Sequence, residues 1–388
     1  MAKNKKNTKF STKSIHTGNR IDETGATVTP LHLTSTFRQP SFSSSEKFVY
    51  SRTGGPTIDA LEENFAMLED AKFSFAFASG MAAMSAIFLM FKPGDHVLIS
   101  QNVYGGVFRL VTKVLNDNGV NFDFIDTTDL KIIKQAIRPT TKLIHLETPS
   151  NPLLEIADIS SISKVCKSKN ILVSVDNTFM SPYGQKPLNL GADIVMHSTT
   201  KYIGGHSDVM MGVTVCNKKY LNLINRWKRN SGQCVGPDDI FLALRGLRTL
   251  PLRLKQSQEN SIKLAHFLTK QKEVKKVYHP ALKEHPDHKL WKRDFNGACG
   301  IFGIEFKDYI TTKMAEFFAD NCLLFGKGAS WGGYESLMTM TDIKSNRTIN
   351  TSYVPKGEYL RIYVGIENIE DILDDVRDSF TKMRKKFK

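Results

Sequence analysis

Short apolar runs and longer amphipathic segments alternate between residue 50 and about residue 245. The apolar runs predict β-strands at 97–99, 121–125, 142–146, 171–175 and 193–196. The segments between them predict helices at 106–118, 128–137 and 158–169. This alternation favours a mostly parallel sheet with helices on both faces, in which a functional site lies beyond the carboxyl ends of the strands.

The order of elements changes after about residue 248. The pattern there predicts a helix at 253–271, strands at 274–278, 301–306 and 359–364, a helix at 312–320 and a terminal helix from 368. The first 49 residues show weak periodicity, which indicates an arm that packs on something else, such as another subunit. We therefore expect an arm over 1–49, a large α/β domain over 50–247 and a smaller α+β domain over 248–388.

The composition is that of a globular protein, because 41% of its 388 residues are hydrophobic and 24% are charged. No apolar run reaches the roughly 18 residues of a membrane helix, and the Lys-rich start lacks the apolar stretch of a secretory signal. The five cysteines lack the paired spacing of a zinc site or a disulfide framework. We expect a soluble cytoplasmic protein without a bound metal.

Two features raise other classes of function. The net charge of +14 is compatible with nucleic-acid binding, but ten basic residues lie in two tails without interleaved aromatic residues: Lys3, Lys5, Lys6, Lys9, Lys13, Lys382, Arg384, Lys385, Lys386 and Lys388. We interpret these tails as solvated ends and expect no nucleic-acid partner. The cluster His279, His285 and His288 is compatible with a metal enzyme. Prolines after the first two, and the lack of ligands at zinc spacing, favour turns instead.

The candidate chemistry centres on Lys201, which lies in the run His197-Ser198-Thr199-Thr200-Lys201-Tyr202. Burial and a nearby cation would lower the pKa of its amine, as an imine-forming lysine requires. Asp176 ends the apolar run 173–176, where it can keep a pyridine nitrogen protonated or simply cap a helix. Ser79 and Gly80 precede a run of helix formers, so this segment is either a phosphate cradle or a turn.

Further side chains suit a pyridoxal phosphate (PLP) site. Tyr104 follows the strand at 97–99 and can lay its ring on a cofactor. Tyr50 and Arg52 can complete phosphate binding, since arginine offers a bidentate fork. Arg361 interrupts an otherwise apolar strand, and a substrate carboxylate is a natural partner for its charge.

From about residue 14 to 380 the chain resembles the Cys/Met-metabolism family of PLP enzymes, which includes cystathionine γ-synthase, the cystathionine β- and γ-lyases and methionine γ-lyase. The segments that carry the resemblance are Tyr50-Ser51-Arg52, Ser79-Gly80-Met81, Ser150-Asn151-Pro152, Asp176-Asn177-Thr178, Thr200-Lys201-Tyr202 and Gly205-His206-Ser207-Asp208. The resemblance implies the α/β fold of the type I PLP-dependent transferases, which is like that of aspartate aminotransferase.

The resemblance also implies roles for individual residues. Lys201 would hold PLP as a Schiff base and act as the general base, Asp176 would pair with the ring nitrogen, and Tyr104 would stack on the ring. The phosphate would be held by Gly80, Met81, Ser198 and Thr200.

The remaining implied roles concern the substrate and the subunits. Asn151, Ser330 and Arg361 would hold the carboxylate of an amino-acid substrate and orient the lysine. Tyr50 and Arg52 would reach the cofactor of a neighbouring subunit. We therefore expect a tetramer built of dimers that share their active sites.

Two departures guide the choice of reaction. The γ-lyases and γ-synthases commonly carry Glu before the serine that matches Ser330 and an acidic residue before the tyrosine that matches Tyr50, whereas this chain has Ala329 and Val49. Gly106 replaces the cysteine of the methionine γ-lyases. The segments 244–250, 291–295 and 330–336, with Trp331 lining the site, resemble bacterial cystathionine β-lyases, while 50–61 resembles a γ-lyase.

We therefore expect β-elimination of L-cystathionine to homocysteine, pyruvate and ammonia, a step of methionine biosynthesis or transsulfuration. The alternatives are a γ-lyase, a γ-synthase or a homoserine sulfhydrylase. Reprotonation of the same carbanion on its opposite face would give a side activity as an amino-acid racemase.

Overall fold

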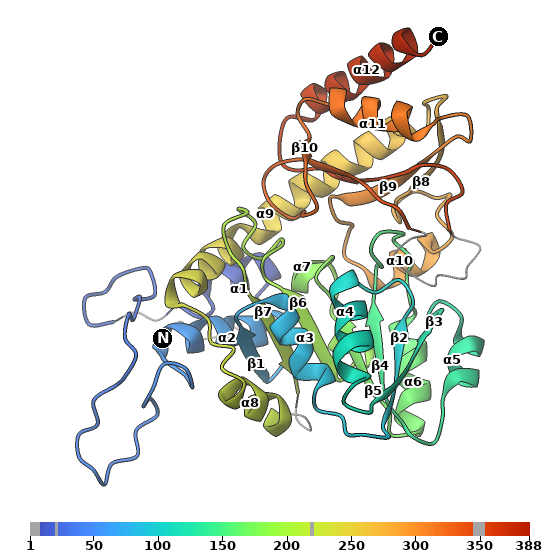
Figure 1. Ribbon diagram of the computed structural model, residues 1–388. Helices are drawn as coiled ribbons and strands as arrows, with labels where there is room; N and C mark the ends of the chain where they lie inside the picture. Colours follow the sequence, from blue (N-terminus) through green and yellow to red (C-terminus); the bar gives the residue numbers. More distant parts are fainter. Residues whose placement is uncertain (1–7, 20–21, 218–220, 344–353) are drawn as a thin grey trace.

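The computed structural model describes residues 8–19, 22–217, 221–343 and 354–388. The chain forms two sheets, each with its own helices. One long helix extends from the larger sheet to the smaller one (Figure 1). Lys3, Lys5 and Lys6 of the predicted basic tail lie outside the described residues.

The larger sheet has seven strands in the order β1-β7-β6-β5-β4-β2-β3. They are β1 (Phe73–Phe77), β2 (His96–Ser100), β3 (Asn121–Ile125), β4 (Thr141–Glu147), β5 (Leu172–Asp176), β6 (Ile194–Ser198) and β7 (Gly212–Cys216). Strand β7 is antiparallel to both of its neighbours, and the remaining pairs are parallel. The predicted mostly parallel sheet is confirmed, although the predicted strands omitted β1 and β7.

Helices cover both faces of this sheet. They are α2 (Pro56–Leu68), α3 (Gly80–Phe88), α4 (Gly105–Leu110) with a π-helical turn (Val111–Leu115), α5 (Leu130–Ala136), α6 (Ile159–Ser168), α7 (Ser181–Gly184), a 3-10 turn (Pro187–Leu190) and α8 (Leu221–Asn230). Successive residues of β2 show the two faces, because Val97 packs in the core under α3, whereas Leu98 packs in the core under α6. The predicted helix at 106–118 corresponds to α4 and the π-helical turn that follows it, which together span 105–115.

The smaller sheet has five strands in the order β10-β11-β12-β9-β8. They are β8 (Val274–Tyr278), β9 (Ile301–Phe306), β10 (Gly326–Lys327), β11 (Leu337–Met340) and β12 (Tyr359–Tyr363). The accompanying helices are α9 (Pro237–Leu268), α10 (His288–Asp294), α11 (Thr312–Asn321) and α12 (Ile369–Lys386). The arrangement agrees with the α+β pattern expected after residue 248.

Helix α9 begins at Pro237, well before the predicted start at 253. Pro237 is the first helical residue, where proline is tolerated, and Pro251 lies inside the helix without ending it. Leu247 packs in the core of the larger sheet, whereas Leu264 packs in the core of the smaller one. The predicted boundary at 247/248 thus falls within a continuous helix.

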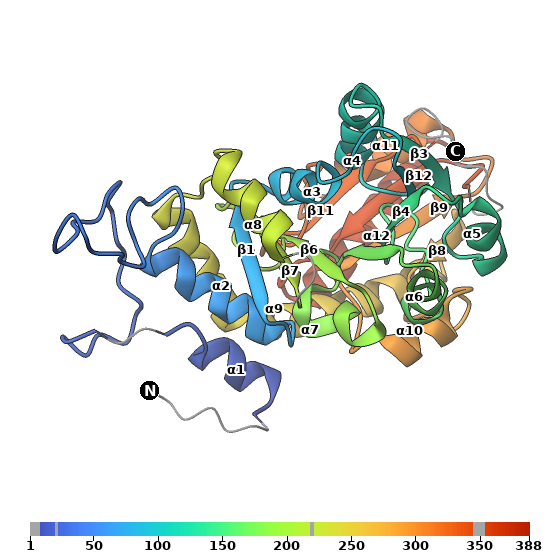
Figure 2. The same ribbon diagram turned by 90° about the horizontal axis from the view of Figure 1, so that it is seen from below.

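The N-terminal segment combines a docked helix with an extended loop. Helix α1 (Phe10–His16) packs on α2 and α9 of its own chain. Residues 22–54 project away from both sheets (Figures 1 and 2) and hold only an isolated bridge between Thr36 and Tyr50 among the described residues. The side chain of Phe42 on this loop is fully exposed.

The C-terminal basic residues are not a free tail. All of them except Lys388 lie on α12, and Arg384 forms an ion pair with the buried Glu273 at 2.8 Å. The interpretation of these residues as a solvated end is therefore wrong for Arg384. Its ion pair joins α12 to Glu273, the residue that directly precedes β8. No helix in the described part of the chain combines the length and the apolar character needed to cross a membrane.

Candidate active site

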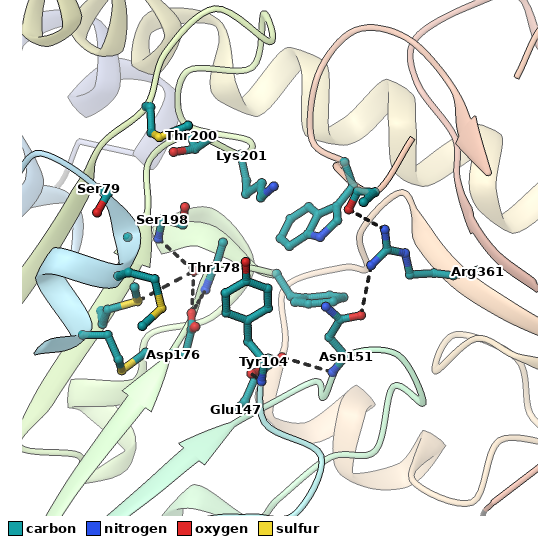
Figure 3. Close-up of a pocket in the computed structure, with 18 residues that line it drawn as sticks. Ser79, Tyr104, Glu147, Asn151, Asp176, Thr178, Ser198, Thr200, Lys201 and Arg361 are labelled. Carbon is teal, nitrogen blue, oxygen red and sulfur yellow. Dashed lines mark hydrogen bonds between the residues drawn. The ribbon is translucent and has the colours of Figure 1, made fainter. Parts of the chain in front are cut away.

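A cavity of about 250 Å³ opens where the carboxyl ends of β4, β5 and β6 meet the start of α3 (Figure 3). Its wall contains many of the residues singled out in the sequence: Gly80, Met81, Tyr104, Asn151, Asp176, Ser198, Thr200, Lys201, Ala329, Trp331 and Arg361. The last three come from the part of the chain that forms the smaller sheet. Both domains therefore build the cavity, at the sheet edge that the strand pattern indicated.

Lys201 lies three residues beyond β6, on a turn that the buried Arg253 holds. The Arg253 guanidinium donates a hydrogen bond of 2.8 Å to the carbonyl of Tyr202. Burial of the Lys201 amine, assisted by the positive charge of Arg361, lowers its pKa to about 8. A larger share of this amine is therefore neutral near physiological pH, as a nucleophile or a general base requires.

Asp176 ends β5 and points into the cavity. One of its carboxylate oxygens accepts hydrogen bonds from the backbone N–H of Thr178, at 2.9 Å, and from the Thr178 hydroxyl. Burial raises the pKa of this carboxyl, while the Thr178 hydrogen bonds and His197 oppose the rise. The alternative role as a helix cap is wrong, because α7 begins at Ser181 with Met180 at its N-cap.

A cradle of backbone N–H groups and hydroxyl groups lies at the start of α3. The Ser79 side chain caps the helix by accepting a hydrogen bond of 3.0 Å from the N–H of Ala82. A Cβ atom on Gly80 would lie 2.8 Å from Oγ of Ser198, so only glycine allows the helix to approach the end of β6 this closely. The free N–H groups of the helix start and the Ser198 hydroxyl thus face the same space, which suits a phosphate group. The alternative that Gly80 only forms a turn is wrong, since it begins the helix.

Arg361 and Asn151 form a polar wall opposite the cradle. Arg361 is buried on β12, where it donates hydrogen bonds to the Asn151 side-chain oxygen at 3.3 Å and to the Ala329 carbonyl at 2.7 Å. Both acceptors are neutral oxygens. The guanidinium therefore brings a positive charge to the cavity wall, and Figure 3 shows Asn151 between Arg361 and Tyr104.

Aromatic rings form the wall beside Lys201. The indole of Trp331 is buried, with its centroid 4.6 Å from the ring of Phe179 and 5.4 Å from that of Tyr202. The Lys201 Nζ atom lies 5.4 Å from the Trp331 centroid, within cation–π range. Ser330 does not line the cavity, but its hydroxyl contacts the Lys201 amine.

Tyr50 and Arg52 lie outside this cavity, on the projecting N-terminal loop. Nearly half of the Tyr50 side chain is exposed, and Arg52 donates a hydrogen bond of 2.6 Å to the carbonyl of Arg229. Their expected place in the site of a neighbouring subunit stays a prediction.

The sequence patterns missed several residues of the cavity wall: Ser79 as a wall residue, Met84, Glu147, Thr178, Phe179, Met196 and Met210. Glu147 could have been predicted from the sequence, because it is a carboxylate at the end of an apolar strand, as Asp176 is. The two carboxylates are register partners on β4 and β5. Phe179 and the methionines carried no such signal, since apolar residues occur throughout the core.

The histidine cluster belongs to a structured turn away from this cavity. His279 and His285 are buried, and each ring accepts a hydrogen bond from the N–H two residues later, at 3.1 Å in both cases. Burial lowers their pKa values to about 3 and about 4. Among the described residues, no group of three metal-ligating side chains is placed to bind an ion.

A family model described as Cys/Met metabolism PLP-dependent enzyme matches residues 11–381. A cystathionine β-lyase of Lactococcus lactis subsp. cremoris (strain MG1363) is 41% identical over 97% of this chain and 100% of its own length. A cystathionine γ-lyase of Bacillus subtilis (strain 168) is 41% identical over 95% of this chain and 98% of its own. The solved structure of cystathionine γ-lyase from Lactobacillus plantarum complexed with L-serine has a TM-score of 0.91 and 38% identity over 97% of this chain and all of that one.

Proposed function

The chain belongs to the Cys/Met metabolism PLP-dependent enzyme family, and from that premise we propose that it cleaves L-cystathionine by β-elimination into homocysteine, pyruvate and ammonia. The membership establishes the PLP dependence. The individual residue roles and the choice of the β-reaction are our proposals.

The cavity residues fit PLP at its three reactive or charged groups. The cradle of Gly80, Ser198 and the α3 start suits the phosphate, because a side chain at Gly80 would fill the space. The buried Asp176 carboxylate suits a protonated ring nitrogen, whose positive charge would favour the ionised carboxylate. The Lys201 amine suits the aldehyde carbon. Met81 and Thr200 line the same wall, and we assign them to the phosphate end.

When bound, PLP withdraws electrons from the substrate α-carbon, so that its proton can leave and a substituent at the β-carbon can be expelled. Lys201 would take the α-proton once the substrate amine has replaced it at the cofactor, and the lowered pKa of its free amine, about 8, suits a base near neutral pH. Tyr104 would stack on the ring, and its hydroxyl or Lys201 would protonate the departing thiolate. Asp176 would keep the ring nitrogen in its protonated form.

The substrate carboxylate binds at the polar wall. Arg361 offers a buried guanidinium, which can form two parallel hydrogen bonds to a carboxylate. Asn151 is held beside it by the 3.3 Å contact to Arg361. We assign the amino-acid end of the substrate to the space near Lys201, because Ser330, which contacts the lysine, follows directly on Ala329, which contacts the arginine.

The aromatic wall at Trp331 is the observation that carries the choice of β-elimination. The indole is locked between Phe179 and Tyr202 and stands beside the Lys201 amine. The adjacent wall position, Ala329, holds a methyl group where the γ-acting members of the family commonly carry a glutamate. A γ-reaction requires a second proton transfer at the β-carbon, and this wall offers it no carboxylate at position 329.

The γ-reactions remain the second candidate, since relatives of equal identity are named cystathionine γ-lyase. One assay separates the two. Purified protein supplied with PLP and L-cystathionine is analysed for its 2-oxo acids and thiols. We expect pyruvate and homocysteine, whereas release of 2-oxobutyrate and cysteine would refute the β assignment. Lys201→Ala, treated in the same way, is the control for uncatalysed breakdown.

The projecting arm supports an assembly in which the active sites are shared. Tyr50 and Arg52 lie on a loop that leaves its own domain, and the loop exposes apolar side chains such as Leu33 and Phe42. Such exposed apolar surface favours burial against another subunit. We therefore assign Tyr50 and Arg52 to the phosphate end of a neighbouring site, in a dimer that pairs further into a tetramer.

A further inference from the structure

Glu147 stands at the junction between the cofactor side and the substrate side of the cavity. It is the last residue of β4, its side chain is buried, and it lines the cavity beside its register partner Asp176. The proposed chemistry gives Asp176 a task but leaves Glu147 without one. A buried carboxylate is costly unless it is well bonded, so its partners indicate what it does.

The two oxygens of Glu147 bind the backbones of two different site residues. Oε2 accepts a hydrogen bond of 2.5 Å from the N–H of Tyr104, and Oε1 accepts one of 3.1 Å from the N–H of Asn151. Figure 3 shows Glu147 beneath Tyr104, with Asn151 to one side at the end of a dashed line. One carboxylate therefore anchors the N-cap residue of α4 and a residue of the loop after β4.

We propose that Glu147 is a positioning residue that fixes Tyr104 and Asn151 relative to each other, and thereby couples the ring-stacking side chain to the substrate-carboxylate site. The inference rests on the proposed roles of Tyr104 and Asn151. The charge is essential to the arrangement, because only a carboxylate presents an acceptor on both oxygens. An amide at this position would turn an NH₂ group toward one of the two N–H donors.

Glu147→Gln is the direct test, since glutamine has nearly the same shape. Glu155→Gln is the matched control. Glu155 is also buried in this region, where it accepts a hydrogen bond from the Asn102 side chain, but it does not line the active-site cavity. If loss of a buried carboxylate acts only on stability, both variants should lower the melting temperature and leave the kinetics alike.

For total 2-oxo acid released from L-cystathionine, we expect Glu147→Gln to lower kcat/KM roughly ten- to a hundredfold, the effect of losing a hydrogen bond to a charged acceptor. We also expect a raised KM and a changed absorption band of the bound cofactor, with Glu155→Gln close to wild type in both. Kinetics and spectrum of Glu147→Gln that match those of Glu155→Gln would overturn the proposal. If Glu147→Gln does not fold, Glu147→Asp, whose shorter side chain withdraws both oxygens, replaces it. Its kinetics and spectrum are then compared with those of Glu155→Gln in the same way.

A double-mutant cycle with Asn151→Ala locates the effect. If Glu147 acts through the placement of Asn151, the two substitutions together should cost less than the product of their separate fold-losses. Strictly multiplicative losses would overturn this coupling. Because total 2-oxo acid is measured, a γ-reaction does not disturb the test. Wild-type protein that releases none would refute the proposed function alone, since PLP affinity and spectrum of the two glutamine variants still decide the role of Glu147.

Discussion

The Lys201 amine donates a hydrogen bond of 2.8 Å to the hydroxyl of Ser330. Lys201 follows β6 of the larger sheet, whereas Ser330 lies between β10 and β11 of the smaller one. This contact therefore joins the two domains beside the cavity and fixes the position of the amine.

Ser330→Ala should slow the reaction by misdirecting the base. We expect kcat to fall about tenfold, in line with one lost hydrogen bond to a charged group. KM should change little, because Arg361 and Asn151 still hold the substrate carboxylate. Steady-state kinetics measures kcat and KM separately and so checks that only kcat falls. Ser207→Ala removes a hydroxyl that binds Glu335 and is absent from the cavity wall, so an equal fall in kcat for that variant would contradict the interpretation.

The lowered pKa of Lys201 predicts that this residue destabilises the PLP-free protein. The folded state holds the amine at a pKa of about 8 and the unfolded chain at about 10.5. Between these values the unfolded state binds more protons, so the stability of the fold rises with pH, and below pH 8 the full penalty is present. The difference corresponds to about 3 kcal/mol at most.

Lys201→Met should therefore stabilise the PLP-free protein at pH 7, and its advantage over wild type should shrink as the pH approaches 10. Denaturant unfolding at several pH values measures this. The exposed Lys142 serves as the control through Lys142→Met, which should show no such trend. A constant advantage of Lys201→Met across the range would show that packing, not charge, is responsible.

Local sequence patterns predicted most strands of the larger sheet. They failed where tertiary packing determines the length of an element. The β4 and β5 strands were predicted to within a residue at each end, because each is a continuous apolar run between turns. The start of α9 was placed at 253, whereas the helix begins at Pro237 and continues through Pro251. Tertiary packing of Ile240, Leu244 and Leu247 keeps the chain helical through that proline.

A shared active site predicts that two inactive variants rescue each other. Arg52→Ala should weaken the neighbour's phosphate site, and Lys201→Ala should abolish its own. In a hybrid dimer, one site would combine an intact Lys201 with an intact Arg52, so mixing the two variants under exchange should restore activity. Activity assays after unfolding and refolding the mixture check this. No recovery, with hybrids demonstrated by mass spectrometry, would place Arg52 outside the neighbouring site.

Trp331→Leu should shift the products toward the γ-reaction. Removing the indole opens the wall between Phe179 and Tyr202, which allows more positions for the β-carbon and its leaving group. We expect a higher ratio of 2-oxobutyrate to pyruvate, measured by chromatography of the 2-oxo acids. Trp291→Leu, outside the cavity, controls for general loss of packing. An unchanged ratio would contradict the assigned role of Trp331.

A site residue could be predicted from the sequence when its side chain is charged and its neighbours in the sequence are apolar. Lys201, Asp176 and Arg361 are charges in apolar surroundings, and such residues require partners. Glu147 carried the same mark at the end of β4 but was missed, because its task is to bind backbone groups that no residue pattern reveals. The place of Tyr50 and Arg52 in a neighbouring subunit's site came from the resemblance alone, and within one chain neither residue lines the cavity.

The central claim is that Lys201 carries PLP, and covalent mapping tests it most directly. Purified protein saturated with PLP is reduced with borohydride, which makes the bond between the cofactor and a lysine permanent, and its peptides are analysed by mass spectrometry. We predict the pyridoxyl label on the peptide that contains Lys201, and its loss in Lys201→Ala. A label on another lysine, or none at all in PLP-saturated protein, would contradict the account.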